Sequence, residues 1–209
     1  EYFSFLQVKP YRSYSIYTFA DTALFRQGML NVKKERGPFR VISVGALRMQ
    51  KNHRFLVDAF RVLKADNIQL DIYGDGPLRK ELQEQINSSG VTINLKGMVT
   101  NLHDILPQYD LFVMSSTFEG FSLGVLESMA AKVPLLLSDI VSFREQCEDS
   151  AAYFNLDDPG EFVQKIKELA ANPVKRNQLR EKAYARVMEN FTLAHHMKQL
   201  KQVYTDNIE

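Results

Sequence analysis

Short apolar runs that alternate with helical patterns constrain the fold of this chain more than any other feature. Each run has about five residues, is rich in Val, Ile and Leu, and is followed by a polar loop and a segment with the apolar spacing of a helix. Strands of this length separated by helices favour a parallel sheet covered on both faces and joined by right-handed crossovers. The predicted strands are 40–45, 68–74, 91–95, 110–114, 134–138 and 151–155. The sequence therefore predicts an α/β fold with a doubly wound, Rossmann-like parallel sheet.

The amino-terminal segment lies outside this pattern. Residues 1–38 are rich in aromatic side chains and show no sustained helical period. The alternation in Tyr14–Phe19 predicts a short strand, and the polar stretch 31–38 predicts a connector. The chain begins at Glu1 rather than at a methionine, which is typical of a processed or truncated protein.

The carboxyl-terminal segment is helical by pattern. A break between two helices is predicted at Asn172-Pro173, and a last helix is predicted from Phe191 to about Tyr204, with Thr192 as its N-cap. We therefore expect three parts: 1–38 as the remnant of an amino-terminal domain with a linker, 39–190 as the Rossmann-like α/β domain and 191–209 as a terminal helix.

Charge and cysteine content exclude several classes of protein. The formal net charge is +1, and the basic residues are scattered, which gives no electrostatic case for nucleic-acid binding. The single cysteine, Cys147, excludes an internal disulfide and a thiolate metal cluster. No apolar run approaches the ~20 residues that span a bilayer, and the start of the chain lacks the layout of a signal peptide. These features predict a cytoplasmic protein.

One carboxylate is out of place in the segment Phe121–Val133. This segment reads as a helix buried on nearly all sides, because only Glu127 and Lys132 are charged. The neighbours of Glu127 at helical spacing are apolar or small, and an unpaired buried charge costs several kcal/mol as an order of magnitude. Two explanations remain open: a ligand hydroxyl, or a partner from another element.

In a doubly wound sheet, ligands bind outside the carboxyl ends of the strands. This rule places four predicted loops at one edge of the sheet: 45–51, 74–77, 97–101 and 115–123. The last of these enters the helix with the backbone amides of Phe121, Ser122 and Leu123, which together with the helix dipole favour an anion such as phosphate. Gly120 allows close approach of that anion to the backbone.

Charged side chains near this helix start complete a candidate site. Lys51 and Arg48, in the loop after the first strand, can reach the same anion. Glu127 lies one turn further along the helix, where a carboxylate can accept hydrogen bonds from ribose hydroxyls. Glu119 precedes the turn, close to the place where a reacting group attached to the phosphate would lie. The pair Glu119 and Glu127 therefore predicts a sugar nucleotide between them.

The segment Glu-Gly-Phe-Ser-Leu-Gly-Val-Leu-Glu, from Glu119 to Glu127, resembles the signature of retaining glycosyltransferases of family 4, the group 1 glycosyltransferases, which have the GT-B fold. Further pieces that resemble the family are Ser43–Gly45 with Lys51-Asn52, Tyr73–Pro77, Lys96-Gly97 and Pro134–Asp139. Residues 39–205 resemble its carboxyl-terminal, nucleotide-sugar-binding half. Residues 20–25 resemble the segment that links the two halves, and the last helix resembles the one that crosses back.

The resemblance implies a role for each matched residue. Lys51 would contact the diphosphate, Glu119 would be the catalytic residue against the donor sugar, and Glu127 would bind the ribose. The implied donor-binding residues are Lys51, Arg48, Gly45, Gly120, Phe121, Ser122, Leu123, Glu127, Met98, Val99 and Gly74. The sequence departs from the family at Ala46, where an arginine is usual, and Arg48 would have to replace it.

The implied reaction transfers a sugar from a UDP-, GDP- or ADP-sugar to an acceptor hydroxyl, with retention and without an essential metal, in cell-surface polysaccharide synthesis. The acceptor would be a saccharide or a lipid-linked saccharide, bound by an amino-terminal half that these residues lack. The full enzyme would then reach the inner face of a membrane as a peripheral protein, and this chain alone would transfer little sugar.

Two other functions are open at this stage. A GT-B-fold sugar-nucleotide epimerase would use similar phosphate and ribose contacts, and a receiver-like, non-catalytic module would need acidic residues at strand ends. The histidines indicate no metal site, because His195 and His196 are adjacent on a helix and cannot share one ion without strain. We expect His53 and His103 to be helix caps or surface residues.

Overall fold

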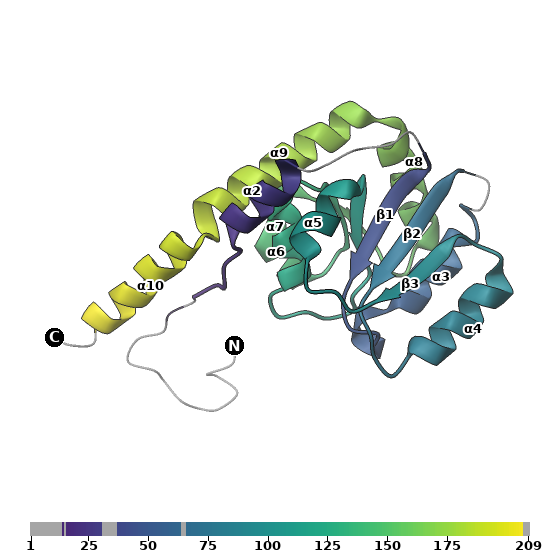
Figure 1. Ribbon diagram of the computed structural model, residues 1–209, viewed down its shortest axis with the longest axis horizontal. Coiled ribbons are helices and arrows are strands. Elements are labelled where there is room, and N and C mark those ends of the chain that lie inside the picture. Colours follow the sequence, from purple (N-terminus) through teal and green to yellow (C-terminus); the bar gives the residue numbers. More distant parts are fainter. Residues whose placement is uncertain (1–13, 15, 31–36, 64–65, 207–209) are drawn as a thin grey trace.

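The computed structural model describes residues 14, 16–30, 37–63 and 66–206, and its core is one six-stranded parallel sheet (Figure 1). The strand order is β3-β2-β1-β4-β5-β6, so the order reverses between β1 and β4. The strands are β1 (Phe39–Val44), β2 (Ile68–Tyr73), β3 (Ile93–Gly97), β4 (Leu111–Met114), β5 (Leu135–Ser138) and β6 (Ala152–Phe154). All the strands predicted from the apolar runs after residue 39 are confirmed.

Helices cover the sheet from both sides and form two apolar cores, which confirms the doubly wound α/β fold. One face carries α3 (His53–Phe60), α4 (Arg79–Ser89) and α8 (Pro159–Ala171). The other face carries α2 (Thr22–Leu30), α5 (Leu102–Ile105), α6 (Leu123–Ala130), α7 (Val141–Cys147) and α9 (Pro173–Asn190). All residues of β4 and β5 are buried, as expected for central strands with helices on both faces.

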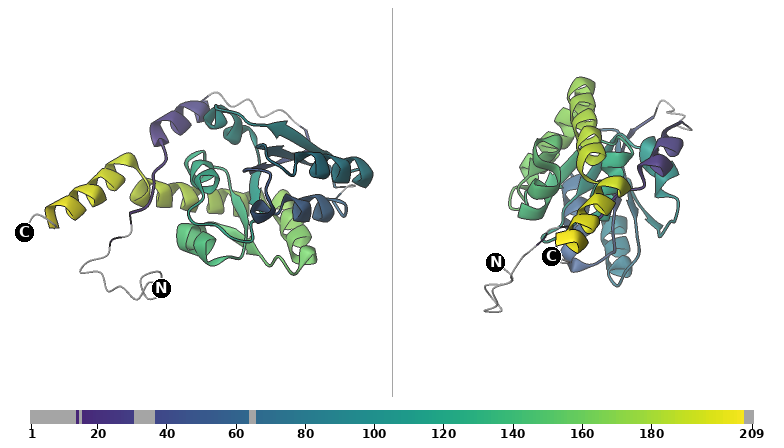
Figure 2. Two further views of the ribbon diagram at one scale, coloured as in Figure 1. Left: turned by 90° about the horizontal axis from the view of Figure 1, so that it is seen from below. Right: turned by 90° about the vertical axis from the view of Figure 1, so that its left-hand side faces the viewer.

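The last helix, α10 (Leu193–Asp206), extends away from the sheet (Figures 1 and 2). Thr192 caps it, because its hydroxyl oxygen accepts a hydrogen bond from the amide of His195 at 3.2 Å, as predicted. None of its described residues is buried. Among the helices that the structure describes, none is long and apolar enough to span a bilayer.

The predicted strand at Tyr14–Phe19 is wrong. Residues 16–19 belong to no strand, and only an isolated bridge joins the next residue, Ala20, to Thr192. The ring of Tyr17 instead packs on Phe121, with centroids 5.2 Å apart. Alternating aromatic residues here reflect ring packing on the domain rather than pairing in a sheet. Residue 15 and the predicted connector at 31–36 lie outside the described residues.

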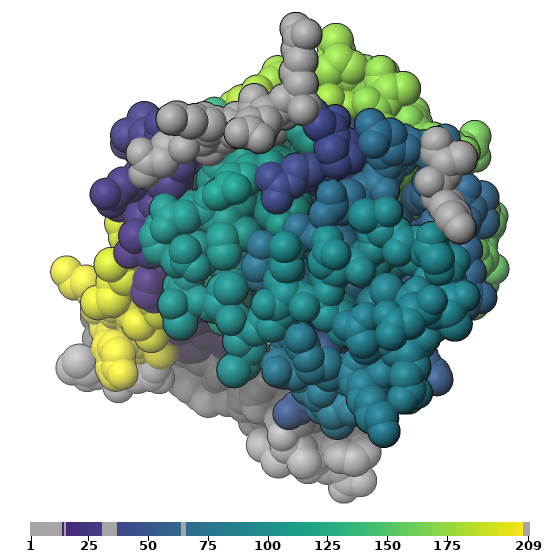
Figure 3. Space-filling model, turned by 45° about the vertical axis from the view of Figure 1, so that its right-hand side comes forward, coloured from purple at the N-terminus to yellow at the C-terminus, as the bar shows by residue number. Residues whose placement is uncertain are grey.

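Helix α2 is not predicted by the sequence, since residues 1–38 show no sustained period. It packs against α5 so closely that a Cβ on Gly28 would lie 1.9 Å from the backbone oxygen of His103. In the space-filling view α2 (purple) lies beside the teal segment that includes α5 (Figure 3). Tertiary contact through a small residue, rather than helical periodicity, holds this helix.

Helix α6 is shorter and less enclosed than predicted. It begins at Leu123 and ends at Ala130, and Leu123 is 55% exposed. Gly124 and Glu127 are half-buried beside it. The expectation that the helix is buried on nearly all sides is therefore wrong for one stripe, which faces the carboxyl ends of the strands.

Candidate functional site

The loops after β1 and β4 lie together at the carboxyl edge of the sheet, where the strand order reverses. The backbone oxygen of Gln50 accepts a hydrogen bond from the amide of Thr117 at 2.9 Å, and the Gln50 side chain donates to the Phe118 oxygen at 2.7 Å. The hydroxyl of Ser115 donates to the Asn52 oxygen at 2.9 Å. These bonds fix the two loops to each other and set the floor of the candidate site.

The loops after β2 and β3 close the same edge. The amide of Leu47 donates to the Asp75 oxygen at 3.0 Å, and the amide of Gly74 donates to the Gly97 oxygen at 2.8 Å. Gly74 has a φ of +141°, and a Cβ on it would lie 2.0 Å from the Gly45 oxygen. Only glycine fits at this crossing of two loops. The four predicted loops therefore meet at one edge.

An ion pair lies at the centre of this edge. Lys51 Nζ donates to Glu119 Oε1 at 2.6 Å, and the hydroxyl of Ser116 donates to the same oxygen at 2.7 Å. The side chains of Lys51 and Glu119 are 18% and 8% exposed. A Cβ on Gly45 would lie 3.2 Å from the Lys51 stem, so Gly45 leaves room for that side chain. The structure thus brings two predicted site residues into direct contact.

The start of α6 presents fewer free amides than predicted. The Ser122 amide donates to Gln146 Oε1 at 3.1 Å, and Gln146 Nε2 donates back to the Ser122 oxygen at 2.9 Å. The Ser122 amide is thus bonded within the protein, and its predicted phosphate contact stays a prediction. Within the described residues no hydrogen bond engages the amides of Leu123 and Gly124, the first two residues of α6. These two amides, and that of Phe121, which also has no hydrogen bond among the described residues, can bind an anion.

Glu127 lies one helical turn beyond Leu123 and Gly124. Its side chain is half-buried, and this burial raises the pKa of its carboxyl above the usual value. No described residue forms a hydrogen bond or ion pair with the Glu127 carboxylate. Of the two explanations left open by the sequence, a partner from another element is thus not found among the described residues.

The other predicted site residues differ in their exposure to solvent and in their packing contacts. Gly120 is exposed, and a Cβ on it would meet nothing within 4 Å. Arg48 is exposed and Met98 is 80% exposed, while Val99 is half-buried. The ring of Phe121 packs on Tyr17 and Phe191, so only its backbone faces the site. No group of three or more potential metal ligands occurs among the described residues.

The predicted surface position of His53 is wrong. The residue is 3% exposed at the start of α3, and its Nδ1 has no hydrogen-bond partner among the described residues. Asn52, with a left-handed φ of 50°, turns the chain from the Lys51 loop into α3. Burial, and secondarily the charge of Lys51, lower the pKa of His53 to about 4.

This buried imidazole should make the stability of the protein depend on pH. Since the folded-state pKa of about 4 is below the ordinary value of 6.5, the unfolded chain binds the extra proton, and stability falls as pH drops from 6.5 toward 4. The loss is roughly 3 kcal/mol. Urea unfolding across this pH range should show a shallower slope for His53→Leu than for the wild type. His195→Leu, at a half-buried position on α10, should keep the wild-type slope; an equal slope for His53→Leu would contradict the prediction.

Several residues that build the site are not predicted by the sequence. Gln146, on α7, orients the first residue before α6, and Ser116 holds the Glu119 carboxylate. Gln50 joins the two central loops, and Gly124 lies where α6 meets β1, with the Val44 oxygen 3.4 Å from the position of a Cβ. Only Gly124, a glycine near a helix start, carries a signal in the sequence that could have identified it.

With this geometry in place, comparison with known proteins assigns the chain to a family. Residues 38–172 match the family described as "Glycosyl transferases group 1", a span that includes the whole sheet and every loop of the site. The chain belongs to the group 1 glycosyl transferases. The resemblance in the Glu119–Glu127 segment is thereby confirmed at the level of the family.

The curated relatives are longer than the chain. An uncharacterized glycosyltransferase of Methanocaldococcus jannaschii is 36% identical over 105 residues, which cover 48% of this chain and 26% of the relative. A Campylobacter jejuni enzyme, N-acetylgalactosamine-N,N'-diacetylbacillosaminyl-diphospho-undecaprenol 4-alpha-N-acetylgalactosaminyltransferase, is 34% identical over 101 residues, 47% of this chain and 27% of that enzyme. The matched part thus spans about a quarter of the length of these relatives.

Solved glycosyltransferase structures share the fold. Anabaena Alr3699/HepE in complex with UDP has a TM-score of 0.80 at 19% identity, covering 91% of this chain and 57% of that one. Staphylococcus aureus TarM, with UDP and saccharide ligands, has a TM-score of 0.81 at 19% identity, covering 96% and 41%. At this level of identity the likeness supports the Rossmann-like α/β fold of GT-B glycosyltransferases and does not extend to individual residues.

Proposed function

We propose that this chain is the nucleotide-sugar-binding half of a retaining glycosyltransferase. The observation that carries the proposal is the half-buried carboxylate of Glu127, which no described residue binds and which lies one turn beyond the unbonded amides of Leu123 and Gly124. A diphosphate at the helix start would place ribose hydroxyls near this carboxylate. The UDP complexes of HepE and TarM support a UDP-sugar as the donor.

The catalytic part of the proposal rests on charge. As the sugar leaves, negative charge grows on the diphosphate, and the α6 amides, the helix dipole and Lys51 would stabilise it. The ammonium of Lys51 would then lie between the leaving group and Glu119, its partner at 2.6 Å. Glu119 would contact the donor sugar from that position. We propose that no metal is essential, because Lys51, exposed Arg48 and the helix start together supply positive charge.

The rest of the enzyme follows from the family. We propose that the acceptor is a saccharide or lipid-linked saccharide bound by a second half, toward which α10 extends, and that residues 39–206 alone transfer little sugar. Relatives named for diphosphoundecaprenol-linked acceptors, from Campylobacter jejuni and Escherichia coli, support cell-surface polysaccharide synthesis. Such acceptors would bring a cytoplasmic enzyme to the inner face of the membrane.

The alternative functions gain no support. The strand order β3-β2-β1-β4-β5-β6 is that of dinucleotide-binding sheets and differs from the 2-1-3-4-5 order of receiver domains. The family match and the named relatives are glycosyltransferases, which does not favour the epimerase.

The test is whether Glu127 recognises ribose hydroxyls. Calorimetric titration should show that UDP binds roughly tenfold more tightly than 2′,3′-dideoxy-UDP, since two hydrogen bonds to a charged acceptor are lost. Glu127→Gln should remove most of this difference by weakening UDP alone. Glu189→Gln, at an exposed position on α9, is the matched control and should keep it.

The same titration with GDP and ADP would identify the base. Binding of UDP, GDP or ADP at millimolar concentration or below supports the donor site. If none of them binds, or if Glu127→Gln leaves the ratio of UDP to dideoxy-UDP affinity unchanged, the proposal fails for this chain.

A further inference from the structure

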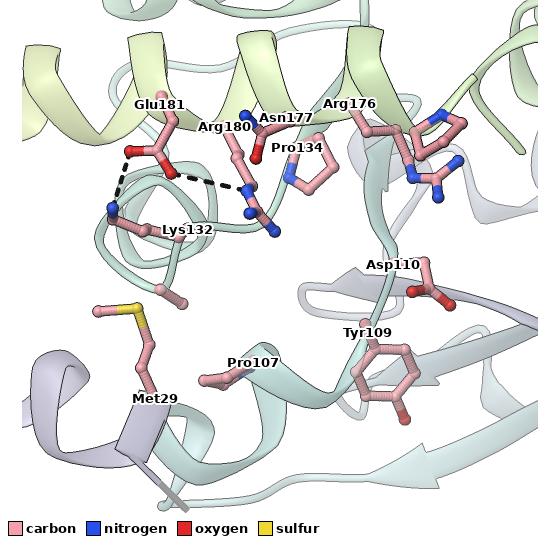
Figure 4. A pocket seen from close by; sticks show the side chains of 12 residues that line it. Met29, Pro107, Tyr109, Asp110, Lys132, Pro134, Arg176, Asn177, Arg180 and Glu181 are labelled. Atoms are coloured by element: carbon pink, nitrogen blue, oxygen red, sulfur yellow. Dashed lines mark hydrogen bonds and ion pairs between the residues drawn. The ribbon is translucent and has the colours of Figure 1, made fainter. Parts of the chain in front are cut away.

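A cavity of about 510 Å³ lies at the end of the sheet opposite to the donor site. Tyr109 and Asp110, just before β4, and Pro134, just before β5, line it, so it is at the amino ends of the strands. Its other walls come from α2, the turn after α6, and α9 (Figure 4). Its volume is in the range of small-molecule sites.

The face of α9 above this cavity has an unusual composition. Ala183 and Val187 are fully buried, and the same stripe continues toward the helix start through Arg180 and Arg176, at spacings of three and four residues. The stripe is therefore apolar where α9 packs on the core and cationic where it covers the cavity. The guanidinium donors that this stripe buries need hydrogen-bond acceptors opposite them.

Two of the three cations in the cavity have short hydrogen bonds to acceptors of the protein. Lys132 Nζ donates to Glu181 at 2.7 Å and lies over the ring of Tyr184. Arg176 donates to the backbone oxygens of Leu169 and Ala170 at the end of α8. These contacts explain Lys132 and Arg176 as parts of the fold.

Arg180 is different. Its Nε is buried and has no hydrogen-bond partner among the described residues. Its ion pair with Glu181 is long, with 3.7 Å between this Nε and Oε1, and the other oxygen of Glu181 already binds Lys132. The rest of the Arg180 side chain is open to the cavity, since the side chain as a whole is 42% exposed. Figure 4 shows the guanidinium of Arg180 directed into the cavity beside Asn177, with Lys132 on the other side. A bound acceptor in the cavity would satisfy this buried donor.

We propose that this cavity binds a small molecule through a phosphate group. The planar donors of Arg180 match phosphate oxygens, the ammonium of Lys132 adds charge, and the amide of Asn177 adds a neutral donor. The free volume beyond the guanidinium accommodates an organic body such as one sugar ring. The site is separate from the donor site and does not depend on the proposed transferase function.

Residue-resolved binding tests the site. We would titrate the ¹⁵N-labelled chain with inorganic phosphate, glucose 6-phosphate, acetate and glucose at constant ionic strength, and follow the amide signals of Lys132, Asn177 and Arg180. Both phosphates should shift these signals saturably, and acetate and glucose should not. Tighter binding of glucose 6-phosphate would identify an organic phosphate as the ligand, and equal binding would identify free phosphate.

Variants distinguish specific phosphate binding in the cavity from non-specific electrostatic attraction to basic side chains on the surface. Arg180→Leu should weaken phosphate binding at least about tenfold, whereas Arg54→Leu, an exposed arginine on α3 that pairs with Glu81, should leave it within about twofold. Arg180→Lys keeps the positive charge but loses the planar pair of guanidinium donors, so it should weaken phosphate binding to an intermediate degree. The proposal is overturned if the three signals do not saturate, if Arg180→Leu binds as the wild type does, or if acetate binds as tightly as phosphate.

Discussion

Replacing Gly74 by alanine is expected to lower the free energy of unfolding by roughly 4 kcal/mol, as strain and overlap add. The φ of +141° is a region that residues with a Cβ rarely adopt, and the new methyl group would lie 2.0 Å from the Gly45 oxygen. That oxygen belongs to the backbone of the loop after β1, so a rotamer change cannot relieve the overlap. Urea denaturation of the wild type and the variant measures the effect.

Two other glycines of the same edge are the controls. Gly97 also has a positive φ, +78°, but a Cβ on it meets nothing within 4 Å, so Gly97→Ala should cost only about 1 kcal/mol of strain. Gly120 has neither constraint, and Gly120→Ala should change stability by less than about 0.5 kcal/mol. Equal losses at Gly74 and Gly97 would show that the overlap with Gly45 is absent.

The second large effect concerns the Lys51–Glu119 ion pair. Lys51→Met should lower the free energy of unfolding by about 3 kcal/mol, because the Glu119 carboxylate, 8% exposed, would keep Ser116 as its hydrogen-bond donor but lose its counter-charge. Adding Glu119→Gln to Lys51→Met should recover most of this loss, since a neutral amide no longer needs the ammonium. Chemical denaturation of both single variants and the double variant measures the coupling.

The chain offers a matched control for this pair. Lys182 and Asp149 have the same N to O distance, 2.6 Å, but their side chains are 55% and 80% exposed. Lys182→Met should therefore leave the free energy of unfolding almost unchanged. If both lysine substitutions cost the same, burial does not set the strength of the Lys51–Glu119 pair.

Local sequence was sufficient to predict the sheet. Each strand is a short apolar run between polar loops, and central strands such as β4 and β5 are buried on both faces, so their composition alone indicates their place. The strand order and the meeting of four loops at one edge then follow from general rules of doubly wound folds. The sequence also predicted that Glu119 and Glu127 lie near the start of one helix, because Glu119 is in the loop just before α6 and Glu127 is about one turn into it.

The detailed state of the site could not be predicted in the same way. Whether the Ser122 amide is free depends on Gln146, 24 residues away, and a sequence pattern does not report that hydrogen bond. The start of a helix favours a surface position for His53, but the left-handed turn at Asn52 precedes a buried ring. Pairing across elements and the direction of single side chains are set by tertiary packing, which periodicity does not encode.

Packing also explains why the strand prediction in the amino-terminal segment is wrong. Tyr17 has the alternating context of a strand, yet its edge-to-face contact with Phe191 and its packing on Phe121 are what hold it. Its backbone oxygen lies 2.7 Å from a ring nitrogen of His196 on α10. The segment is thus ordered by its partners rather than by its own pattern.

The ring cluster of Tyr17, Phe121 and Phe191 also bears on where this unit can be cut. Phe121 is the last residue before the N-cap of α6, and its two ring partners come from opposite ends of the chain, before β1 and after α9. A fragment trimmed to the sheet and its covering helices would lack Tyr17 and Phe191, leave the Phe121 ring without these two contacts, and remove the buried Ala20 from the core. The smallest independently expressible unit is therefore larger than the α/β layers, and it must include Tyr17 and Phe191 for the loop that enters α6 to hold its shape.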